Sequence, residues 1–417
     1  MQLHNDIWAN IIIVQTKSAM VEFLVKLAKN ILGNEKGGSN LNALVNNYKS
    51  EVDRYKNNAE KDLERIKEKM NRIKSYICEL NKGVKEIYGK DKIDLLIIAL
   101  PEYAIPIIEH IDLTNIINEE SFCGNNEKLK ERIDEKIHNI VNKNFISKIK
   151  ELYESICNSF HVTEFIVVGG LQLLVKYGDV IFPHNCVITF YKPCNFYKFH
   201  IIHKCPLSPF EYDVFTKILS LYREKLKGPI IHRLMCLWDM GIKCERSIKI
   251  FNNNMKLFIP ICFELHALLR YKIINALSLN LPPNIYLKHI RKLSEEFKSA
   301  HIIINPSALS KTEYMDIFSY ITTLTHKLLI FPNDHKYGKS SICFKYSGET
   351  GILPPQAKIK TLQLYGKHAL MYYIPIDGDN DLLMAAALLK PIIKVNGIAG
   401  LEVSDIRLIT CKLATGV

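Results

Sequence analysis

Three apolar segments of the chain each lead to a side chain that could take part in covalent chemistry. The run "LLIIALPEY" leads to Glu102, "FHIIHK" to Lys204 and "KLFIPIC" to Cys262, and Glu211 follows Lys204 by seven residues. Each run has the apolar, β-branched character of a buried strand, and ligand sites of α/β proteins collect at the carboxyl ends of strands. A thiol, an ammonium and a carboxylate brought together there would form a set for nucleophilic catalysis by sulfur.

Each of these residues also has a purely structural interpretation. Cys262 could be an inert core thiol, since buried cysteines are common. Glu102 could serve only its turn, and Lys204 could be a charged guard on an edge strand. Glu211 could have no part in a site. The sequence alone leaves these alternatives open.

The elements that must position these residues alternate between strands and helices. Strands are predicted at 10–15, 92–106, 164–170, 185–193, 196–204, "SIKIF", "KLFIPIC", 301–308, 327–334, "SICFKY" and "HALMYYIPI", and helices after residue 20, at 145–160, from Cys262 to about 279 and near 311–327. The segments 185–193 and 196–204 are predicted to form an antiparallel pair. Many strands are wholly apolar, so both of their faces are buried. This pattern predicts a layered α-β-β-α or α-β-α body.

A long helix is predicted from about 41 to 84. Its apolar residues recur at steps of three and four, which gives one stripe on an otherwise charged surface. The stripe consists of Val52, Tyr55, Ala59, Leu63, Ile66, Met70, Ile73, Ile77 and Leu80. It fits either a helix packed on its own domain or a coiled-coil or oligomer contact.

Composition limits the class of protein. The 417 residues are 48% hydrophobic, which excludes global disorder, and the net charge of +12 is spread along the chain. Nucleic-acid binding remains an alternative that this diffuse charge does not favour, because basic charge alone supplies sequence-independent attraction. Eleven cysteines without a C-x-x-C pair are typical of a reducing cytosol, so a cytoplasmic protein is expected.

Neither a membrane span nor a metal site is predicted. No uncharged apolar run approaches about 18 residues, and "LLMAAALLKPIIKV" is interrupted by Lys390 and Pro391. His200, His203 and Cys205 are close in sequence, but strand alternation sends positions 200 and 203 to opposite faces. No motif for a nucleotide or other cofactor is present either, so no cofactor is expected.

The ordered set of motifs resembles the nitrilase superfamily, the carbon–nitrogen hydrolases. That family has a strand followed by Pro-Glu-Tyr or similar, a strand ending in Lys with a second Glu downstream, and Cys followed by an aromatic residue and an acid. All three occur here in the same order. Further matches are Gln15, Gly169-Gly170, Asn185, Arg270, "INPSA", and "YGKSS" with Gly338 and Ser340, so that the resemblance covers about 10–355 with gaps.

The resemblance implies an α-β-β-α sandwich of nitrilase type, in one domain over 1–417 that forms dimers or larger homo-oligomers. Members cleave amides, nitriles, ureides or carbamoyl amines, and one branch transfers acyl groups. The segment "HKCPLSPFEYDVF" is similar to that acyltransferase branch, but it lacks the glycine and the membrane part found there. Extra length relative to the family falls at about 35–88, 107–143, 213–243 and 280–298. Insertions near strand ends are expected to wall or lid the pocket.

Physical chemistry assigns the same residues their roles. A free cysteine is only slightly ionised at neutral pH, so Glu102 would accept the proton of Cys262 as the sulfur attacks, and later protonate the leaving amine and activate water. Lys204, with the backbone N–H of Phe263, would stabilise the oxyanion. Glu211 would orient Lys204 or assist proton transfer.

Three functions follow as hypotheses. The favoured one is a thiol-dependent hydrolase of an amide or nitrile, acting on a small molecule. The second is an acyltransferase that uses the same acyl-enzyme. The third is a non-enzymatic binding or assembly module that uses the helix stripe at 52–80 and the basic surface. Glu264 is expected to stabilise the start of the helix after Cys262, and Arg270 to fix local structure.

Overall fold

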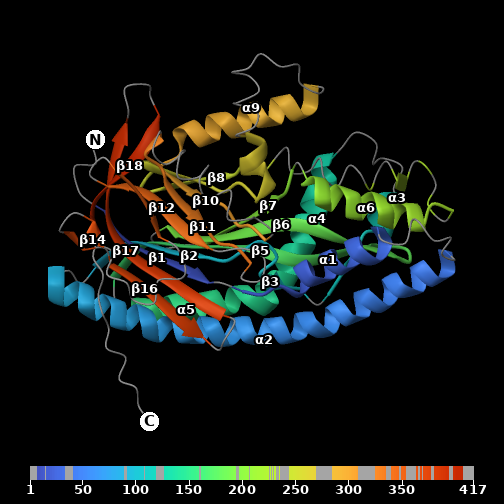
Figure 1. Ribbon diagram of the computed structural model, residues 1–417, viewed down its shortest axis with the longest axis horizontal. Helices are drawn as coiled ribbons and strands as arrows, with labels where there is room; N and C mark the ends of the chain where they lie inside the picture. Colours follow the sequence, from blue (N-terminus) through green and yellow to red (C-terminus); the bar gives the residue numbers. More distant parts are fainter. Residues whose placement is uncertain are drawn as a thin grey trace, which may run out of the picture.

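Two layers of strands pack face to face in the computed structural model, and helices cover both outer surfaces (Figure 1). The structure describes residues 7–14, 16–32, 41–88, 92–107, 109–118, 126–158, 161–193, 197–205, 207–224, 226, 228, 230–231, 234, 244–268, 284–308, 325–334, 340–346, 349–353, 363–364, 367–368, 370–376, 380–393 and 398–406. This is the α-β-β-α arrangement expected from the sequence.

The first layer has the strand order β7-β6-β5-β2-β1. Its strands are β1 (Ile7–Val14), β2 (Lys92–Ala99), β5 (His161–Tyr177), β6 (Val180–Pro193) and β7 (Lys198–His203), with the short β3 (Ile105–Pro106) and β4 (Ile111–Asp112) alongside β5. The predicted antiparallel pair is confirmed as β6 and β7. The strand predicted at 164–170 is only the middle of β5, which turns directly into β6 at Gly178 and Asp179.

The second layer has the order β12-β11-β10-β9-β8. Its strands are β8 (Ser247–Ile250), β9 (Met255–Phe258), β10 (Ile302–Ile304), β11 (Leu328–Phe331) and β12 (Ser341–Tyr346), and β13 (Glu349–Leu353) pairs with β12. The strands β9, β10 and β11 are parallel. The helix predicted near 311–327 lies mostly outside the described residues.

Two strands near the C-terminus join the layers at one edge. β17 (Asn380–Ile393) pairs with β1 and with β18 (Ala399–Ile406), and β18 pairs with β12. No strand was predicted after "HALMYYIPI", which forms β16 (Leu370–Ile376) beside β17, so the prediction missed β17 and β18. Pro391, which interrupts "LLMAAALLKPIIKV" as a membrane span, lies in register with Leu401 inside the β17–β18 ladder. β14 (Gln363–Leu364) and β15 (Lys367–His368) form a separate pair.

Strand alternation divides the apolar side chains among three cores. Between the layers, Ile11 and Ile97 pack in one cluster with Leu257 and Ile302. The next residues along the first layer, such as Ile98, face α1 (Ala19–Leu32), α2 (Leu41–Tyr88) and α5 (Ser147–Cys157). The outer residues of the second layer pack with Leu293 and Phe297 of α9 (Asn284–Ser299). Both faces of each layer are therefore buried, as the wholly apolar strands predict.

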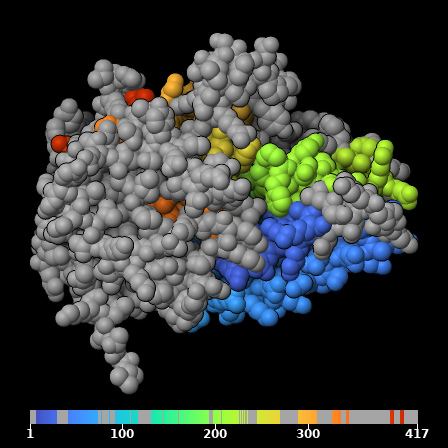
Figure 2. All heavy atoms as spheres, in the orientation of Figure 1, coloured from blue at the N-terminus to red at the C-terminus, as the bar shows by residue number. Residues whose placement is uncertain are grey.

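The long helix α2 packs on its own chain. Every described residue of the predicted stripe, from Val52 to Ile77, is at most 8% exposed. Figures 1 and 2 show α2, in blue, running along one side of the molecule, with α1 and α6 (Pro209–Leu221) nearby. The stripe is covered by the chain itself, so the structure has the first of the two alternatives, a helix packed on its own domain.

The segment at 107–143, which the sequence marks as extra length, contains regular helices. It contains α3 (Thr114–Asn118) and the helix α4 (Asn126–Val141), which continues through a π-helical turn (Asn142–Ile146) into α5. The buried face of α4 consists of Ile133, Ile137 and Val141, a spacing of four that is typical of an amphipathic helix. Charged residues around these three positions hid the pattern.

Candidate active site

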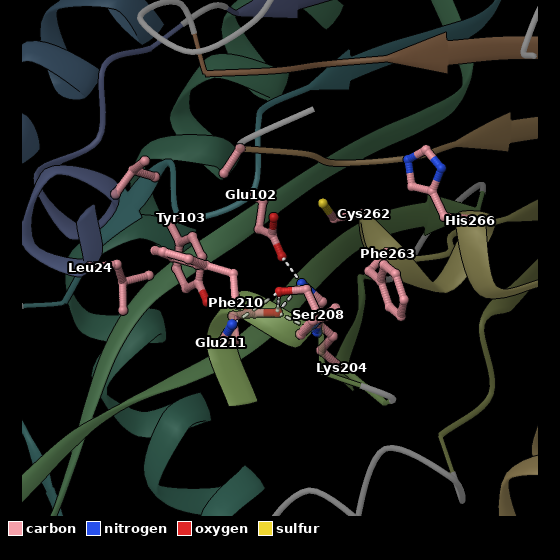
Figure 3. Close-up of a pocket in the computed structure, with 13 residues that line it drawn as sticks. Leu24, Glu102, Tyr103, Lys204, Ser208, Phe210, Glu211, Cys262, Phe263 and His266 are labelled. Atoms are coloured by element: carbon pink, nitrogen blue, oxygen red, sulfur yellow. Dashed lines mark hydrogen bonds and ion pairs between the residues drawn. The ribbon is translucent and has the colours of Figure 1, made fainter. Parts of the chain in front are cut away.

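One pocket collects the ends of three strands. Glu102 follows β2, Lys204 directly follows β7, and Cys262 follows β9, and all three line a cavity of about 310 Å³ together with Glu211 and Phe263 (Figure 3). The structure therefore brings together every residue that the sequence analysis placed in the site. The strand ends come from both layers: Glu102 and Lys204 from the first, and Cys262 from the second.

Two carboxylates hold the ammonium of Lys204. Its Nζ lies 2.7 Å from Glu102 Oε1 and 2.6 Å from Glu211 Oε2, and the lysine is 2% exposed. Burial opposes the charge, but the carboxylates of Glu102 and Glu211 outweigh it and raise the pKa of Lys204 well above its ordinary value. Lys204 is a fixed positive charge, not an exposed edge-strand lysine.

The two carboxylates differ in their environment. Burial raises the pKa of Glu102, against the opposing effect of Lys204. Burial would do the same for Glu211, but Lys204 and the hydroxyl and backbone N–H of Ser208 hold its pKa at about 2. Glu102 is consequently the better base, and Glu211 remains ionised.

Three further residues complete the network, and none was predicted as a site residue. Asn185 Nδ2 donates to Glu102 Oε1 at 2.5 Å and to Glu211 Oε1 at 2.6 Å. The hydroxyl of Tyr103 donates to Glu211 at 2.7 Å. Ser208 and Glu211 form the capping box that starts α6. Asn185 was noted only as a match to the family. The run "SPFE" has the spacing of a capping box, so the contact between Ser208 and Glu211 could have been predicted from the sequence.

Cys262 occupies a sharp turn between strand and helix. Its φ is 45°, in the left-handed region that a residue with a side chain rarely adopts. Its backbone N–H donates to Pro306 at 2.9 Å, and residues 263–268 then form a helical turn. Burial, followed by the nearby carboxylate of Glu102, raises the pKa of the thiol to about 12. The side chain is a half-buried, protonated thiol that lines the pocket.

The segment "INPSA" links the two layers at the site. While Pro306 accepts the N–H of Cys262, the carbonyl of Ser307 accepts the N–H of Glu102 at 3.3 Å. Ser307 in turn donates its N–H to Pro332 at 2.9 Å, after β11. Two adjacent residues therefore fix the backbone on both sides of the pocket.

Gly170 allows the Glu102 loop to lie against β5. A Cβ on Gly170 would lie 2.4 Å from the backbone nitrogen of Tyr103 and 2.6 Å from the Cα of Glu102. Its N–H also donates to Pro101 at 3.0 Å. Only glycine fits this close backbone approach, which gives the Gly169-Gly170 motif a direct structural reason.

A buried ion pair between Glu264 and Arg246 fixes the loops that carry Lys204 and Cys262. Glu264 is fully buried and pairs with Arg246 at 2.7 Å. Its carboxylate also accepts the N–H groups of Ile261, at 2.9 Å, and Cys205, at 2.7 Å. The expectation that Glu264 stabilises the turn is confirmed. Arg246, which also donates to His203 O at 3.0 Å, was missed.

Phe263 begins the helical turn after Cys262. Backbone N–H groups in the first turn of a helix have no acceptor within the helix. The N–H of Phe263 is one of these groups, and Phe263 lines the pocket.

Histidines behind the strands are linked to α4. His203 Nε2 lies 2.7 Å from Asp134, and His203 Nδ1 lies 2.7 Å from His184 Nε2. Because the carboxylate of Asp134 can only accept, His203 donates to it through Nε2 and accepts from His184 through Nδ1 when its ring is neutral. Among the residues that the structure describes, no group of three or more metal-ligating side chains is arranged to hold a metal ion.

Four insertions were expected to wall or lid the pocket. No described residue of 35–88, 107–143, 213–243 or 280–298 lines it. Much of the wall that the described residues form comes from α1 and the first turn of α6. Gln15, Arg270 and Gly338, which carried part of the family resemblance, lie outside the described residues.

Comparisons with known proteins find similar solved structures at low identity. No protein-family model and no curated protein matches the chain. Similar solved structures include an amidase from Nesterenkonia sp. AN1 with the acetamide moiety of fluoroacetamide added covalently at its active-site cysteine, at 8% identity, 93% coverage of both chains and a TM-score of 0.36. Another structure of that amidase, described as a nitrilase-superfamily protein, is 9% identical, covers 91% of this chain and 90% of its own, and has a TM-score of 0.36.

A glutamine-dependent NAD+ synthetase from Acinetobacter baumannii is also similar, at 9% identity and a TM-score of 0.34. The match covers 96% of this chain but 48% of the synthetase, so the chain spans about half of that protein's length.

In the part of the chain that the structure describes, no helix combines the length and the apolar character needed to cross a membrane.

Proposed function

We propose that this chain hydrolyses a carbon–nitrogen bond of an amide or nitrile through an acyl-enzyme on Cys262. The observation that carries the proposal is the convergence of Glu102, Lys204 and Cys262 in one pocket, with the ammonium 2.7 Å from the carboxylate. A sulfur nucleophile, a base and a fixed cation are the groups that such a reaction needs.

The first step is attack by sulfur with transfer of its proton. With a pKa of about 12, Cys262 is a thiol at neutral pH, so a base must take the proton as the C–S bond forms. Figure 3 shows the Glu102 carboxylate beside the Cys262 sulfur, with a dashed line to Lys204. The hydrogen bonds that it accepts from the described side chains, Asn185 and Lys204, both reach Oε1, so we assign the proton to Oε2.

Charge develops on the substrate oxygen, or on the nitrogen of a nitrile, during this attack. Lys204 stays charged and compensates it, together with the N–H of Phe263. Glu211, ionised and bonded to Lys204 at 2.6 Å, holds the ammonium in place. The lysine acts as an electrostatic stabiliser, because its raised pKa makes it a poor proton donor.

Glu102 then reverses its role. With an amide, the protonated carboxyl gives its proton to the leaving amine as the C–N bond breaks, which leaves a thioester on Cys262. With a nitrile, it protonates the nitrogen to give a thioimidate, and a water molecule must add to this carbon before ammonia leaves and the same thioester remains. Glu102 next takes a proton from water, the hydroxide attacks the thioester, and the thiol is restored as the acid leaves. One carboxylate thus serves both half-reactions.

The test is a panel of primary amides and nitriles incubated with the purified full-length chain, with release of ammonia and acid as the readout. Cys262→Ala should abolish turnover, whereas Cys157→Ala, at a half-buried cysteine of α5 outside the pocket lining, should not. Full activity of the Cys262→Ala protein on its substrate ends the proposal. Added hydroxylamine separates hydrolysis from acyl transfer, since a transferase gives mainly the hydroxamate.

Two further features are proposed from the sequence, the first on the family resemblance and the second on the cysteine usage. The chain forms homodimers or larger assemblies of single-domain subunits, and it acts in the cytoplasm. Light scattering after gel filtration measures the first, and a mass equal to one chain across the working concentration range would contradict it.

A further inference from the structure

Away from the reacting groups, the wall of the pocket is apolar. It is formed by Val21 and Leu24 of α1, Pro209 and Phe210 of α6, Phe263 and Ala308 (Figure 3). These side chains enclose the space that a group attached to the carbonyl carbon would occupy once that carbon lies against Cys262. The side chain of the substrate must therefore be compatible with hydrocarbon on several sides.

The polar atoms of the wall are already engaged. The hydroxyls of Tyr103 and Ser208 both donate to Glu211, so the two residues present ring and methylene groups to the cavity. His266, one helical turn beyond Cys262, is the remaining polar side chain of the described lining.

The charges of the site oppose an anionic substrate. Lys204 is in contact with two carboxylates, so the trio of Glu102, Lys204 and Glu211 carries one net negative charge when both acids are ionised. The described lining has no other lysine or arginine. A carboxylate on the substrate would meet no lysine or arginine of the described lining and would be repelled by this net negative charge, which is unfavourable.

The apolar wall is held in place by buried hydrogen bonds. Helix α1 starts where the N–H of Ser18 donates to Asp334, at 2.8 Å, and the N–H of Ala19 donates to Asp62 of α2, at 2.7 Å. Asp62 also accepts from Gln172 of β5, at 3.3 Å. The positions of Val21 and Leu24 are thus fixed by the long helix and both layers, which makes the wall a built feature of the site.

We infer that the acyl group of the substrate is uncharged and apolar, as in a straight-chain, branched or arylalkyl carboxamide or nitrile. The inference rests on the proposed function, because it takes Cys262 as the attacking atom.

The test compares 5-methylhexanamide with glutaramate, whose isopropyl and carboxylate ends have the same shape. The wild-type chain is expected to show a kcat/KM at least about 100-fold higher for the neutral amide, the ratio expected for burying an unpaired charge. A variant adds a second readout. Phe210→Arg places a cation in the wall and should reduce this preference at least about tenfold.

Tyr212→Arg is the matched control for the charge. Tyr212 lies on the same helix, is 49% exposed and is outside the pocket lining, so this variant should keep the wild-type preference. If Phe210→Arg does not fold, the ratio of kcat/KM for the two amides in the wild-type chain is sufficient to test the inference.

The outcomes separate the inference from the function on which it rests. If glutaramate is turned over as fast as 5-methylhexanamide or faster, with acylation of Cys262, the inference of an apolar acyl group is wrong but the proposed hydrolase function is not affected. If neither compound, nor any other amide or nitrile of the panel, acylates Cys262, the proposed function fails and the inference fails with it.

Discussion

The carboxylate of Glu264 accepts the backbone N–H of Cys205 at 2.7 Å, and this contact ties the loop of Lys204 to the turn of Cys262. The same carboxylate holds the N–H of Ile261, immediately before the nucleophile, and the guanidinium of Arg246. One buried carboxylate, that of Glu264, therefore positions both Lys204 and Cys262. Glu264 follows Cys262 by two residues in the chain.

Replacing this acid should cost stability. Glu264→Gln leaves Arg246 as a buried cation without its carboxylate, so we expect the free energy of unfolding to fall by about 3–5 kcal/mol, measured by urea denaturation. The control is Glu151→Gln, which removes an exposed pair with Lys148 on α5 and should change stability by less than about 0.5 kcal/mol. Equal effects of the two substitutions would contradict the supporting role of Glu264.

Gly170 should be irreplaceable for activity. In Gly170→Ala the new methyl meets the backbone of Glu102 and Tyr103 at 2.4–2.6 Å, so the loop must shift and carry the base away from the sulfur. We expect kcat to fall at least about 100-fold, since small misplacements of reacting groups have effects of this size. Gly228→Ala, whose Cβ would meet nothing within 4 Å, should leave kcat unchanged, and a fully active Gly170→Ala protein would refute the close approach.

The pH dependence should follow Glu102. Burial raises its pKa above the ordinary value of a glutamate, and only the ionised form can accept the thiol proton. The kcat/KM should therefore decrease as the pH falls through this raised pKa. The hydrogen bond from Asn185 lowers the pKa of Glu102, so Asn185→Leu should move the acid limb to higher pH and reduce kcat/KM about tenfold on that limb.

Tyr103→Phe is the control for this shift, because its hydroxyl donates to Glu211 and not to Glu102. Its acid limb should coincide with that of the wild type. A shift of the Asn185→Leu limb toward lower pH would contradict the assignment of Glu102 as the base.

Replacing Glu102 should make the Cys262 thiol more reactive although it abolishes turnover. The carboxylate of Glu102 is the second cause, after burial, of the raised pKa of Cys262, whereas Lys204 lowers it. Glu102→Gln should then lower the pKa of the thiol and speed its alkylation by iodoacetamide at pH 8 severalfold, while amide turnover is lost. Peptide-resolved mass spectrometry measures this, with Cys157 of α5 as the internal reference. Slower alkylation in the variant would contradict this electrostatic account.

The strand ends were predictable from the sequence because each reactive residue directly follows a long apolar run. Their partners were harder to predict. Asn185 is one polar residue inside β6, and its function depends on the two carboxylates that the fold brings to it. Arg246 lies 18 residues from Glu264, and no local pattern announces a buried ion pair of this kind.

The strands β17 and β18 were not predicted for a different reason. The alanine-rich run of β17 was judged only as a membrane segment, and Lys390 with Pro391 suggested a break. The structure places Lys390 on an exposed stretch and Pro391 in the ladder with β18. Tertiary pairing with β1 overrides the weak local strand preference of this segment.

The most direct test of the central claim uses an activated acyl donor. The nitrophenyl ester of hexanoic acid needs no acid to expel its leaving group, but the resulting thioester needs Glu102 to activate water. In Glu102→Gln we predict that intact-mass spectrometry finds one hexanoyl group per chain, and that peptide mapping places it on Cys262. An adduct on another residue, its persistence in Cys262→Ala, or no adduct at all would contradict the account.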